Sequence, residues 1–139
     1  MNEILIDLQE KHREKLDELI HLYRYRFHRY GLEFALLFFY MEEDIDISSY
    51  ESFIRLTDSF LKLEDNFYAI VYEDADIEKS SKAAHNIIKH FKQEHGERLI
   101  YISAISIKEK FEKKDMVNQL FMRLKKGISA KISSKILTE

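Results

Sequence analysis

The chain has 139 residues, enough for one domain with its own hydrophobic core. Apolar residues make up 45% and charged residues 34%, and there is no cysteine, which excludes disulfides, a thiolate nucleophile and a cysteine metal cluster. No window approaches the ~18 apolar residues of a membrane span, and the charged, amphipathic amino terminus does not resemble a signal peptide. We therefore expect a cytoplasmic protein without a membrane span.

The net charge of −3 conceals a strong segregation of charge along the chain. Residues 40–78 hold 2 basic and 12 acidic side chains, whereas residues 79–139 hold 14 basic and 6 acidic ones. The two segments either neutralise each other in the fold or face different partners. Because the basic segment lacks the interleaved aromatic residues of single-strand binders, we expect no nucleic-acid partner.

Residues 3–30 have a helical pattern with one continuous apolar stripe: Leu16, Ile20, Tyr23, Phe27 and Tyr30. Leu5 and Leu8 extend the stripe more weakly, because His12 interrupts it. We expect the second half of the helix to pack on the domain and the first half to project and self-associate as a short coiled coil. The alternative is a helix that lies wholly on its own domain. The domain boundaries are residues 1–29 for the helix and 30–139 for the rest.

Residues 34–41 form a continuous apolar run that is rich in aromatics. Its length predicts a strand buried on both faces, and Gly31 is placed to end the preceding helix. Acidic residues follow directly, and the carboxyl end of a central strand is a common place for a site in α/β proteins.

After this strand we expect a helix that is capped by Ser48 or Ser49 and runs to about Lys62, then a polar turn at 63–66 and a strand at 67–72. A second helix is expected to be capped by Asp74 or Asp76 and ended by Gly96, and a strand follows at 99–107. The last expected elements are a helix at 115–126, ended by Gly127, and a short edge strand or tail at 128–137. Alternation of helix and strand predicts one sheet backed by helices. We expect an α+β, ferredoxin-like order with strand 34–41 central; a flavodoxin-like parallel order is the alternative.

Three segments, read together, resemble a GGDEF domain, the fold of diguanylate cyclases. Arg29-Tyr30-Gly31 and the apolar strand resemble the family's Arg-Tyr-Gly segment and first strand. The sequence Leu63-Glu64-Asp65-Asn66-Phe67 lies where the Gly-Gly-Asp/Glu-Glu-Phe signature would lie, and residues 101–107 resemble the family's Thr-Val-Ser-Ile-Gly-Ile-Ala strand. The resemblance implies the ferredoxin-like fold of nucleotide cyclases.

Measured against that family, the chain departs at the positions that carry chemistry. Tyr40 stands where an Asp binds magnesium, and Glu42 aligns with the second Asp. Leu63 and Glu64 replace the two signature glycines that leave room for guanine, and the segment that holds base and phosphate is missing. Phosphoryl transfer depends on such positioning and on metal ions, so the resemblance implies a chain without cyclase activity, metal or cofactor.

Arg55-Leu56-Thr57-Asp58 fits the family's Arg-x-x-Asp inhibitory site for cyclic diguanylate. Arginine and aspartate are suited to phosphate and guanine. However, residues 59–62 leave four positions before the signature where the family has five, and both residues fall inside the helix expected at 48–62. We therefore interpret Arg55 and Asp58 as a salt bridge on a solvated helix face.

These observations favour a catalytically inactive GGDEF-like regulatory or protein-interaction module in bacterial signal transduction, with a protein partner or self-association through the amino-terminal helix. The alternative is a non-catalytic receptor for cyclic diguanylate or another guanine nucleotide, using Arg55 and Asp58 or a cleft beside Tyr40. A third hypothesis is a metal-dependent phosphotransfer enzyme that uses Glu42, Asp44 and Asp65.

Overall fold

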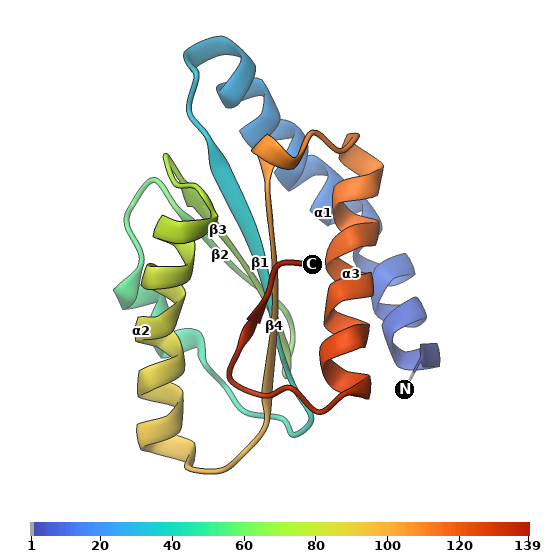
Figure 1. Cartoon of the computed structure of the whole chain (residues 1–139), viewed down its shortest axis with the longest axis vertical. Coiled ribbons are helices and arrows are strands. Elements are labelled where there is room, and N and C mark those ends of the chain that lie inside the picture. Colours follow the sequence, from blue (N-terminus) through green and yellow to red (C-terminus); the bar gives the residue numbers. More distant parts are fainter. Residues whose placement is uncertain (1) are drawn as a thin grey trace.

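A five-stranded sheet with helices on both faces organises the chain (Figure 1). The computed structural model describes residues 2–139, apart from the side chains of Asn2 and Lys114. The elements are α1 (Asn2–Tyr30), β1 (Phe34–Met41), η1 (Ser48–Phe53), β2 (Ser59–Glu64), β3 (Phe67–Glu73), α2 (Ile77–His95), β4 (Ile100–Ser106), η2 (Ile107–Glu109), α3 (Lys113–Ser129) and β5 (Ile136–Leu137). The strand order is β2-β3-β1-β4-β5, so the three predicted strands do share one sheet. None of the helices in this range is apolar enough over enough residues to cross a membrane.

Strand β1 is the centre of the sheet, as predicted. It pairs antiparallel with β3 on one side and with β4 on the other, and all eight of its side chains are buried. Alternate side chains, from Phe34 to Tyr40, enter the core beneath α1 and α3, and those from Ala35 to Met41 enter the core beneath α2. The antiparallel pairing confirms the ferredoxin-like order and excludes the flavodoxin-like one.

Helix α1 has the predicted bounds but not the predicted division into a packed and a projecting half. Leu5 and Leu8, in its first half, are 4% and 8% exposed and belong to the core shared with α3. His12 is also buried and does not interrupt the stripe. It is the opposite end that reaches beyond the sheet, where Tyr30 is 63% exposed (Figure 1). The expected coiled coil through Leu5 and Leu8 is therefore wrong, because those side chains pack within the chain.

An ion-pair group fastens the first half of α1 to the end of β2. Lys11 Nζ lies 2.9 Å from Glu64 Oε1, and His12 Nε2 lies 3.2 Å from Glu64 Oε2. The hydrogen bond and positive charge of Lys11, with a smaller contribution from His12, lower the pKa of Glu64. This partner for His12 lies 52 positions away in the sequence, so the helical pattern alone could not reveal it.

The helix expected from Ser48 or Ser49 to Lys62 is wrong. A single 3-10 segment, η1, is followed by a loop and then by β2, which pairs antiparallel with β3. The side chain of Asp58 accepts the backbone N–H of Arg55 at 2.9 Å, which stabilises a turn where the helix was expected. The turn of the resulting β2–β3 hairpin is formed by Asp65 and Asn66.

Both ends of α2 follow the prediction, whereas the end of α3 does not. Asp76 caps α2 by accepting the backbone N–H of Lys79 at 2.8 Å, and Gly96 ends it with φ of 62°. Helix α3 continues through Gly127 to Ser129. A Cβ on Gly127 would lie 3.0 Å from Leu137 Cδ1, so this glycine admits β5 rather than ending the helix. Strand β5 pairs parallel with β4, which confirms a short edge strand within 128–137.

We expect Leu8→Ala to lower the free energy of unfolding by about 2–3 kcal/mol, because it removes a buried side chain beneath α1. Ile4→Ala is the matched control, since Ile4 lies on the same helix but is 48% exposed. Urea denaturation followed by circular dichroism measures both variants. Equal, small effects would contradict the packing of the first half of α1.

Glu64→Gln tests the ion-pair group by its pH dependence. Since folding lowers the pKa of Glu64, its stabilising contribution is complete above the unfolded-state pKa of about 4.3 and is lost as the pH falls toward the folded-state value. At pH 7 the free energy of unfolding of the wild type should exceed that of Glu64→Gln by up to about 1 kcal/mol, and this difference should shrink below about pH 5. Glu43→Gln, at an exposed pair 3.8 Å from Arg98, should show no such pH-dependent difference in urea titrations.

Candidate functional site

The end of β1 and the β2–β3 turn lie side by side, as the resemblance to the GGDEF signature requires. Asn66 O accepts the backbone N–H of Met41 at 3.0 Å, and Asn66 Nδ2 donates to Met41 O at 2.9 Å. Tyr40 and Phe67 are direct cross-strand partners. The residues singled out in the two segments are therefore brought together, and the amide of Asn66 holds them there.

Tyr40 points into the core and not into a solvated cleft. It is 4% exposed, belongs to the core beneath α1 and α3, and lies edge-on to Phe67 with 6.3 Å between ring centroids. Burial, and to a smaller extent the charge of Glu42, raise the pKa of Tyr40. The position that would hold a metal-binding carboxylate thus holds a neutral, buried phenol.

Glu42 is hydrogen-bonded to a different aromatic side chain, that of Tyr101. The Tyr101 hydroxyl donates to Glu42 Oε1 at 3.1 Å. Burial, followed by the hydrogen bond with Glu42, raises the pKa of Tyr101 to about 12. Because Tyr101 of β4 pairs directly with Tyr40 of β1, two neutral phenols lie side by side at this end of the sheet.

The signature positions of the hairpin have structural contacts. Leu63 is 7% exposed and packs in the core beneath α1, and Glu64 forms the ion pairs with Lys11 and His12. Phe67 is fully buried. Only Asp65 faces solvent, with its side chain 75% exposed and 3.5 Å from Lys62 Nζ. The first two positions therefore tie the hairpin to α1.

The acidic segment after β1 does not converge on one point. No group of three or more His, Cys, Asp or Glu side chains arranged to hold a metal ion is found among the described residues, so Glu42, Asp44 and Asp65 are not gathered into one site. Asp46 instead accepts the backbone N–H of Ser48 at 2.8 Å and the Tyr68 hydroxyl at 3.2 Å. Hydrogen bonding at Ser48, with Lys62 nearby, lowers the pKa of Asp46 to about 2.

Arg55 and Asp58 lie in the loop before β2. The sequence pattern predicts them on a solvated helix face, and that placement is wrong. They do form the expected pair, with Arg55 Nη2 3.1 Å from Asp58 Oδ1 and Arg55 Nε 3.2 Å from Asp58 Oδ2. The Asp58 carboxylate also accepts the backbone N–H of Glu73 at 2.9 Å, and its side chain is only 1% exposed. Asp58 is thus a buried structural acceptor, whereas the Arg55 side chain is 56% exposed.

A cavity of about 240 Å³ opens beside this loop. Its lining combines positively charged, negatively charged and aromatic side chains. The lining residues are Phe53, Arg55, Asp58, Tyr72, Asp74, Ala75, Lys79 and Ala83. The Tyr72 hydroxyl is buried and has no hydrogen-bond partner among the described residues, and burial raises its pKa. A buried hydroxyl without a partner is costly, so a ligand that supplied an acceptor there would be favoured. The sequence pattern identified Tyr72 only as a strand residue and gave no reason to single out Lys79.

Glu73 links the loop before β2 to α1. The sequence pattern did not identify it as a functional residue. Its side chain is 4% exposed and pairs with Arg26 of α1, at 2.6 Å from Nε to Oε2 and 2.7 Å from Nη2 to Oε1. Its backbone N–H donates to Asp58, and its carbonyl accepts from Arg55. The Tyr23 hydroxyl, also on α1, lies 2.6 Å from Ser59 Oγ. An acid at the end of an apolar strand was the available signal, but its partners come from two separate segments, α1 and the loop before β2.

Comparisons with known proteins identify the fold. No protein-family model matches the chain, and no curated protein matches it. Among solved structures, a microbial GGDEF domain studied for its interaction with cyclic di-GMP matches with a TM-score of 0.74 and 7% identity, over 94% of this chain and 92% of that one.

Two further structures agree. The GGDEF domain of DgcB from Caulobacter crescentus, in complex with c-di-GMP, matches with a TM-score of 0.65 and 6% identity, over 91% of this chain and 86% of that one. The active GGEEF domain of a diguanylate cyclase from Vibrio cholerae matches with a TM-score of 0.66 and 13% identity, over 90% and 94%. This chain has the fold of a GGDEF domain.

Proposed function

We propose that the chain is a catalytically inactive GGDEF-like module that acts in bacterial signal transduction through protein interaction. The observation that carries the proposal is the burial of Tyr40 at the end of β1. Cyclase chemistry needs anionic oxygen ligands for metal at this point, and a buried phenol with a raised pKa supplies none.

The hairpin supports the same conclusion. Leu63 fills core space, and Glu64 is held by Lys11 and His12 of α1, so neither position leaves the open turn that a guanine base requires. Asp65 remains as a single exposed carboxylate paired with Lys62. Since phosphoryl transfer is catalysed by positioning and by metal ions together, the loss of both leaves no route to substantial rate. A metal-dependent enzyme built on Glu42, Asp44 and Asp65 gains no support.

A regulatory role is supported by how α1 is attached. The helix is fastened to the hairpin at Glu64 and to the Arg55 loop through Glu73. These contacts give α1 direct connections to both places where the sequence resembles functional motifs of the family. A partner that displaced or stabilised α1 would act on both at once.

The second candidate function is a receptor for cyclic diguanylate or another guanine nucleotide. The observation that favours it is the cavity beside Arg55, in which the Tyr72 hydroxyl lacks a partner. Arg55 and Lys79 offer positive charge for phosphate, and Phe53 offers an aromatic surface for a base. Asp58, being fully engaged, would support Arg55 and not contact the ligand itself.

We expect neither the wild type nor Tyr40→Asp to convert GTP to cyclic diguanylate with magnesium or manganese, with product below detection by liquid chromatography. Restoring one carboxylate leaves Leu63 and Glu64 in place. An active diguanylate cyclase assayed in parallel controls for the conditions. Turnover by the wild type that Asp65→Ala abolishes would overturn the proposal.

The second candidate predicts that cyclic diguanylate or GTP stabilises the fold, by about 2.7 kcal/mol at a hundredfold excess over the dissociation constant. Thermal unfolding with each nucleotide measures the shift. Arg55→Ala should abolish it, whereas Arg98→Ala, whose side chain is similarly exposed at 53% and lies outside this cavity, should not. No shift with any nucleotide would reject the receptor function and leave the interaction module.

A further inference from the structure

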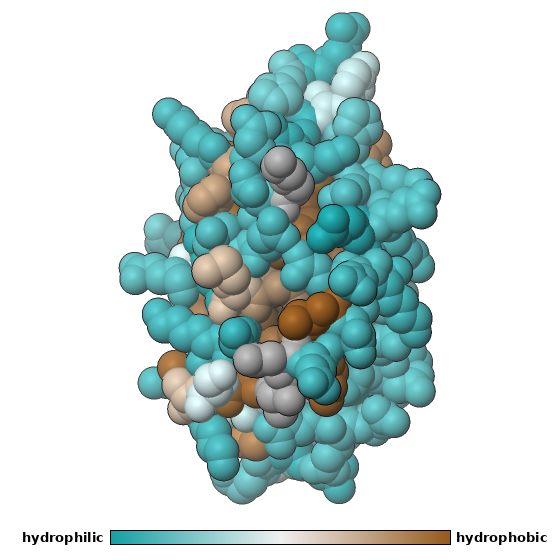
Figure 2. Space-filling model, turned by 90° about the vertical axis from the view of Figure 1, so that its right-hand side faces the viewer, coloured by the Kyte–Doolittle hydropathy of each residue, from teal (hydrophilic) through white to brown (hydrophobic). Residues whose placement is uncertain are grey.

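An apolar hollow lies between the first half of α1 and the second half of α3, on the outer side of the layer that these helices form. It measures about 390 Å³, and Leu5, Ile6, Phe121 and Met122 supply its apolar lining. Ile6 and Met122 are 55% and 61% exposed. Figure 2 shows apolar side chains reaching the surface in the lower part of this face, surrounded by hydrophilic ones. Exposed apolar surface with a polar rim is typical of an interaction site.

A second, larger hollow follows the first along α1. It measures about 630 Å³, and its lining on α1 runs from Glu10 to His21, directly after the residues of α1 that line the first hollow, which lie between Leu5 and Gln9. Together these two hollows, the α1–α3 groove, extend over residues 5–21 of α1, or about 24 Å at a rise of 1.5 Å per residue. The groove is therefore long enough for an extended contact and not only for a single side chain.

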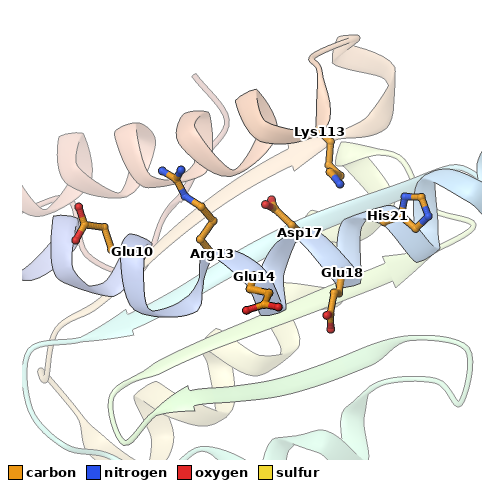
Figure 3. Close-up of a pocket in the computed structure, with 7 residues that line it drawn as sticks. All are labelled: Glu10, Arg13, Glu14, Asp17, Glu18, His21 and Lys113. Carbon is orange, nitrogen blue, oxygen red and sulfur yellow. The ribbon is translucent and has the colours of Figure 1, made fainter.

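Acidic side chains follow this groove along α1. They recur at steps of three or four residues, which gathers them on one side of the helix, and they are Glu3, Asp7, Glu10, Glu14 and Asp17, with Glu18 adjoining them. Figure 3 shows Glu14 and Glu18 pointing away from α3. None of the ion pairs found among the described side chains involves these six acids. The α1 side of the groove is therefore negative and able to pair with positive charge from another molecule.

The basic side chains that line the groove are fewer. Arg13 and Lys113 line the larger hollow together with four acids, and Lys125 lines the smaller one. Lys125 shares its lining with Leu5, and Lys113 shares its lining with His21, so the two lysines of α3 stand at opposite ends of the groove. Negative charge therefore predominates between these ends, on the side that α1 forms.

We propose that the α1–α3 groove binds a basic, amphipathic helix of a partner protein. The apolar side of such a helix covers Ile6 and Met122, and its lysine or arginine side chains, on the flank nearer α1, pair with Glu10 and Glu14. A groove of about 24 Å accommodates a helix of about four turns. The inference rests on the proposed interaction function, because it names the chemistry of that function's partner.

The chemistry of the groove favours this occupant over others. Its walls are the side chains of two helices, so an extended peptide would find no strand edge for its backbone N–H and C=O groups, whereas a helix satisfies them internally. The acids of α1 would repel an anionic membrane surface. A second copy of the chain stacked on this face does not supply the charge, since Lys125 and Lys126 lie beside the first turns of α1, away from Glu10, Glu14 and Glu18.

Fluorescence anisotropy with labelled peptides of about 18 residues, long enough to span the groove as helices, tests the inference. We expect the full chain to bind a peptide that has leucine at every third or fourth position and lysine at most others. Circular dichroism should show the peptide gaining helix on binding, since a helix of this length is marginal alone. A peptide of the same composition, scrambled so that its leucines no longer share one face, should bind at least about 10-fold more weakly. Failure of the first peptide to bind, or equal binding of the scrambled one, would overturn the inference.

Neutral substitutions at the apolar lining locate the bound peptide. Combining Ile6→Asn with Met122→Asn should raise the dissociation constant by about 30-fold or more, because both apolar anchors are lost. Leu22→Asn is the matched control, since Leu22 is 50% exposed on α1 but lines neither hollow, and it should leave the affinity unchanged. Circular dichroism must show that each variant is folded. Unaltered binding by the folded double variant would place the peptide elsewhere and refute the proposed site.

Charge removal tests the sign of the occupant. Combining Glu10→Gln with Glu14→Gln should weaken binding by about 5-fold, and the loss should be greater at low ionic strength, where charges are less screened. Combining Glu94→Gln with Glu97→Gln removes the same charge from exposed positions outside both hollows and should have no effect. A peptide with glutamate in place of lysine should not bind detectably. Binding of this acidic peptide as tight as that of the basic one would contradict the proposed chemistry.

Sedimentation velocity without peptide tests the other occupant. A dimer that the Ile6→Asn and Met122→Asn variant abolishes would assign the groove to a second copy and overturn the inference. A chain that is inert with GTP and binds no basic peptide would overturn this inference alone. A chain that binds the basic peptide but makes cyclic diguanylate would overturn only the proposed inactivity.

Discussion

The sheet and its helices are arranged around β1, which is buried on both faces. Its eight side chains alternate between two cores, one closed by α1 and α3 and the other by α2 and η1. Each face must be covered, because an uncovered row of leucine and phenylalanine side chains would cost roughly 2 kcal/mol for each residue. The strand therefore requires helices on both sides and neighbours on both edges, and the order β2-β3-β1-β4-β5 meets these requirements.

The same burial determines the chemistry at the end of the strand. In a cyclase-like site this end must open to solvent and metal, but here the apolar character of β1 continues through Tyr40 and Met41 into the core. Tyr101 and Phe67 enclose Tyr40 from the neighbouring strands. A carboxylate ligand and a buried phenol cannot occupy the same position, and position 40 of this chain holds the phenol, at 4% exposure.

Ion pairs connect the β2–β3 hairpin to α1. Glu64 and Glu73, at opposite ends of the β2–β3 hairpin, each pair with α1. The backbone N–H of Glu73 also donates to the Asp58 side chain, and its carbonyl accepts from the Arg55 side chain. The side chain of Glu73 is only 4% exposed, so its attraction to Arg26 is less screened than that of surface pairs, whereas the pair of Glu64 with Lys11 is open to solvent, at 29% and 63% exposure.

Local patterns in the sequence were sufficient for β1, α1, α2 and β3, because each has a clear period, a cap such as Asp76 or a stop such as Gly96. They failed where distant contacts decided the conformation. Residues 48–62 have apolar residues at helical spacing, yet β2 forms because pairing with β3 and the Asp58 contacts to Arg55 and Glu73 outweigh helix propensity. His12 is buried with its Nε2 3.2 Å from Glu64 Oε2, and Gly127 is required because a Cβ there would meet Leu137. Such partners are separated by tens of residues or lie on other elements, so only the tertiary structure brings them together.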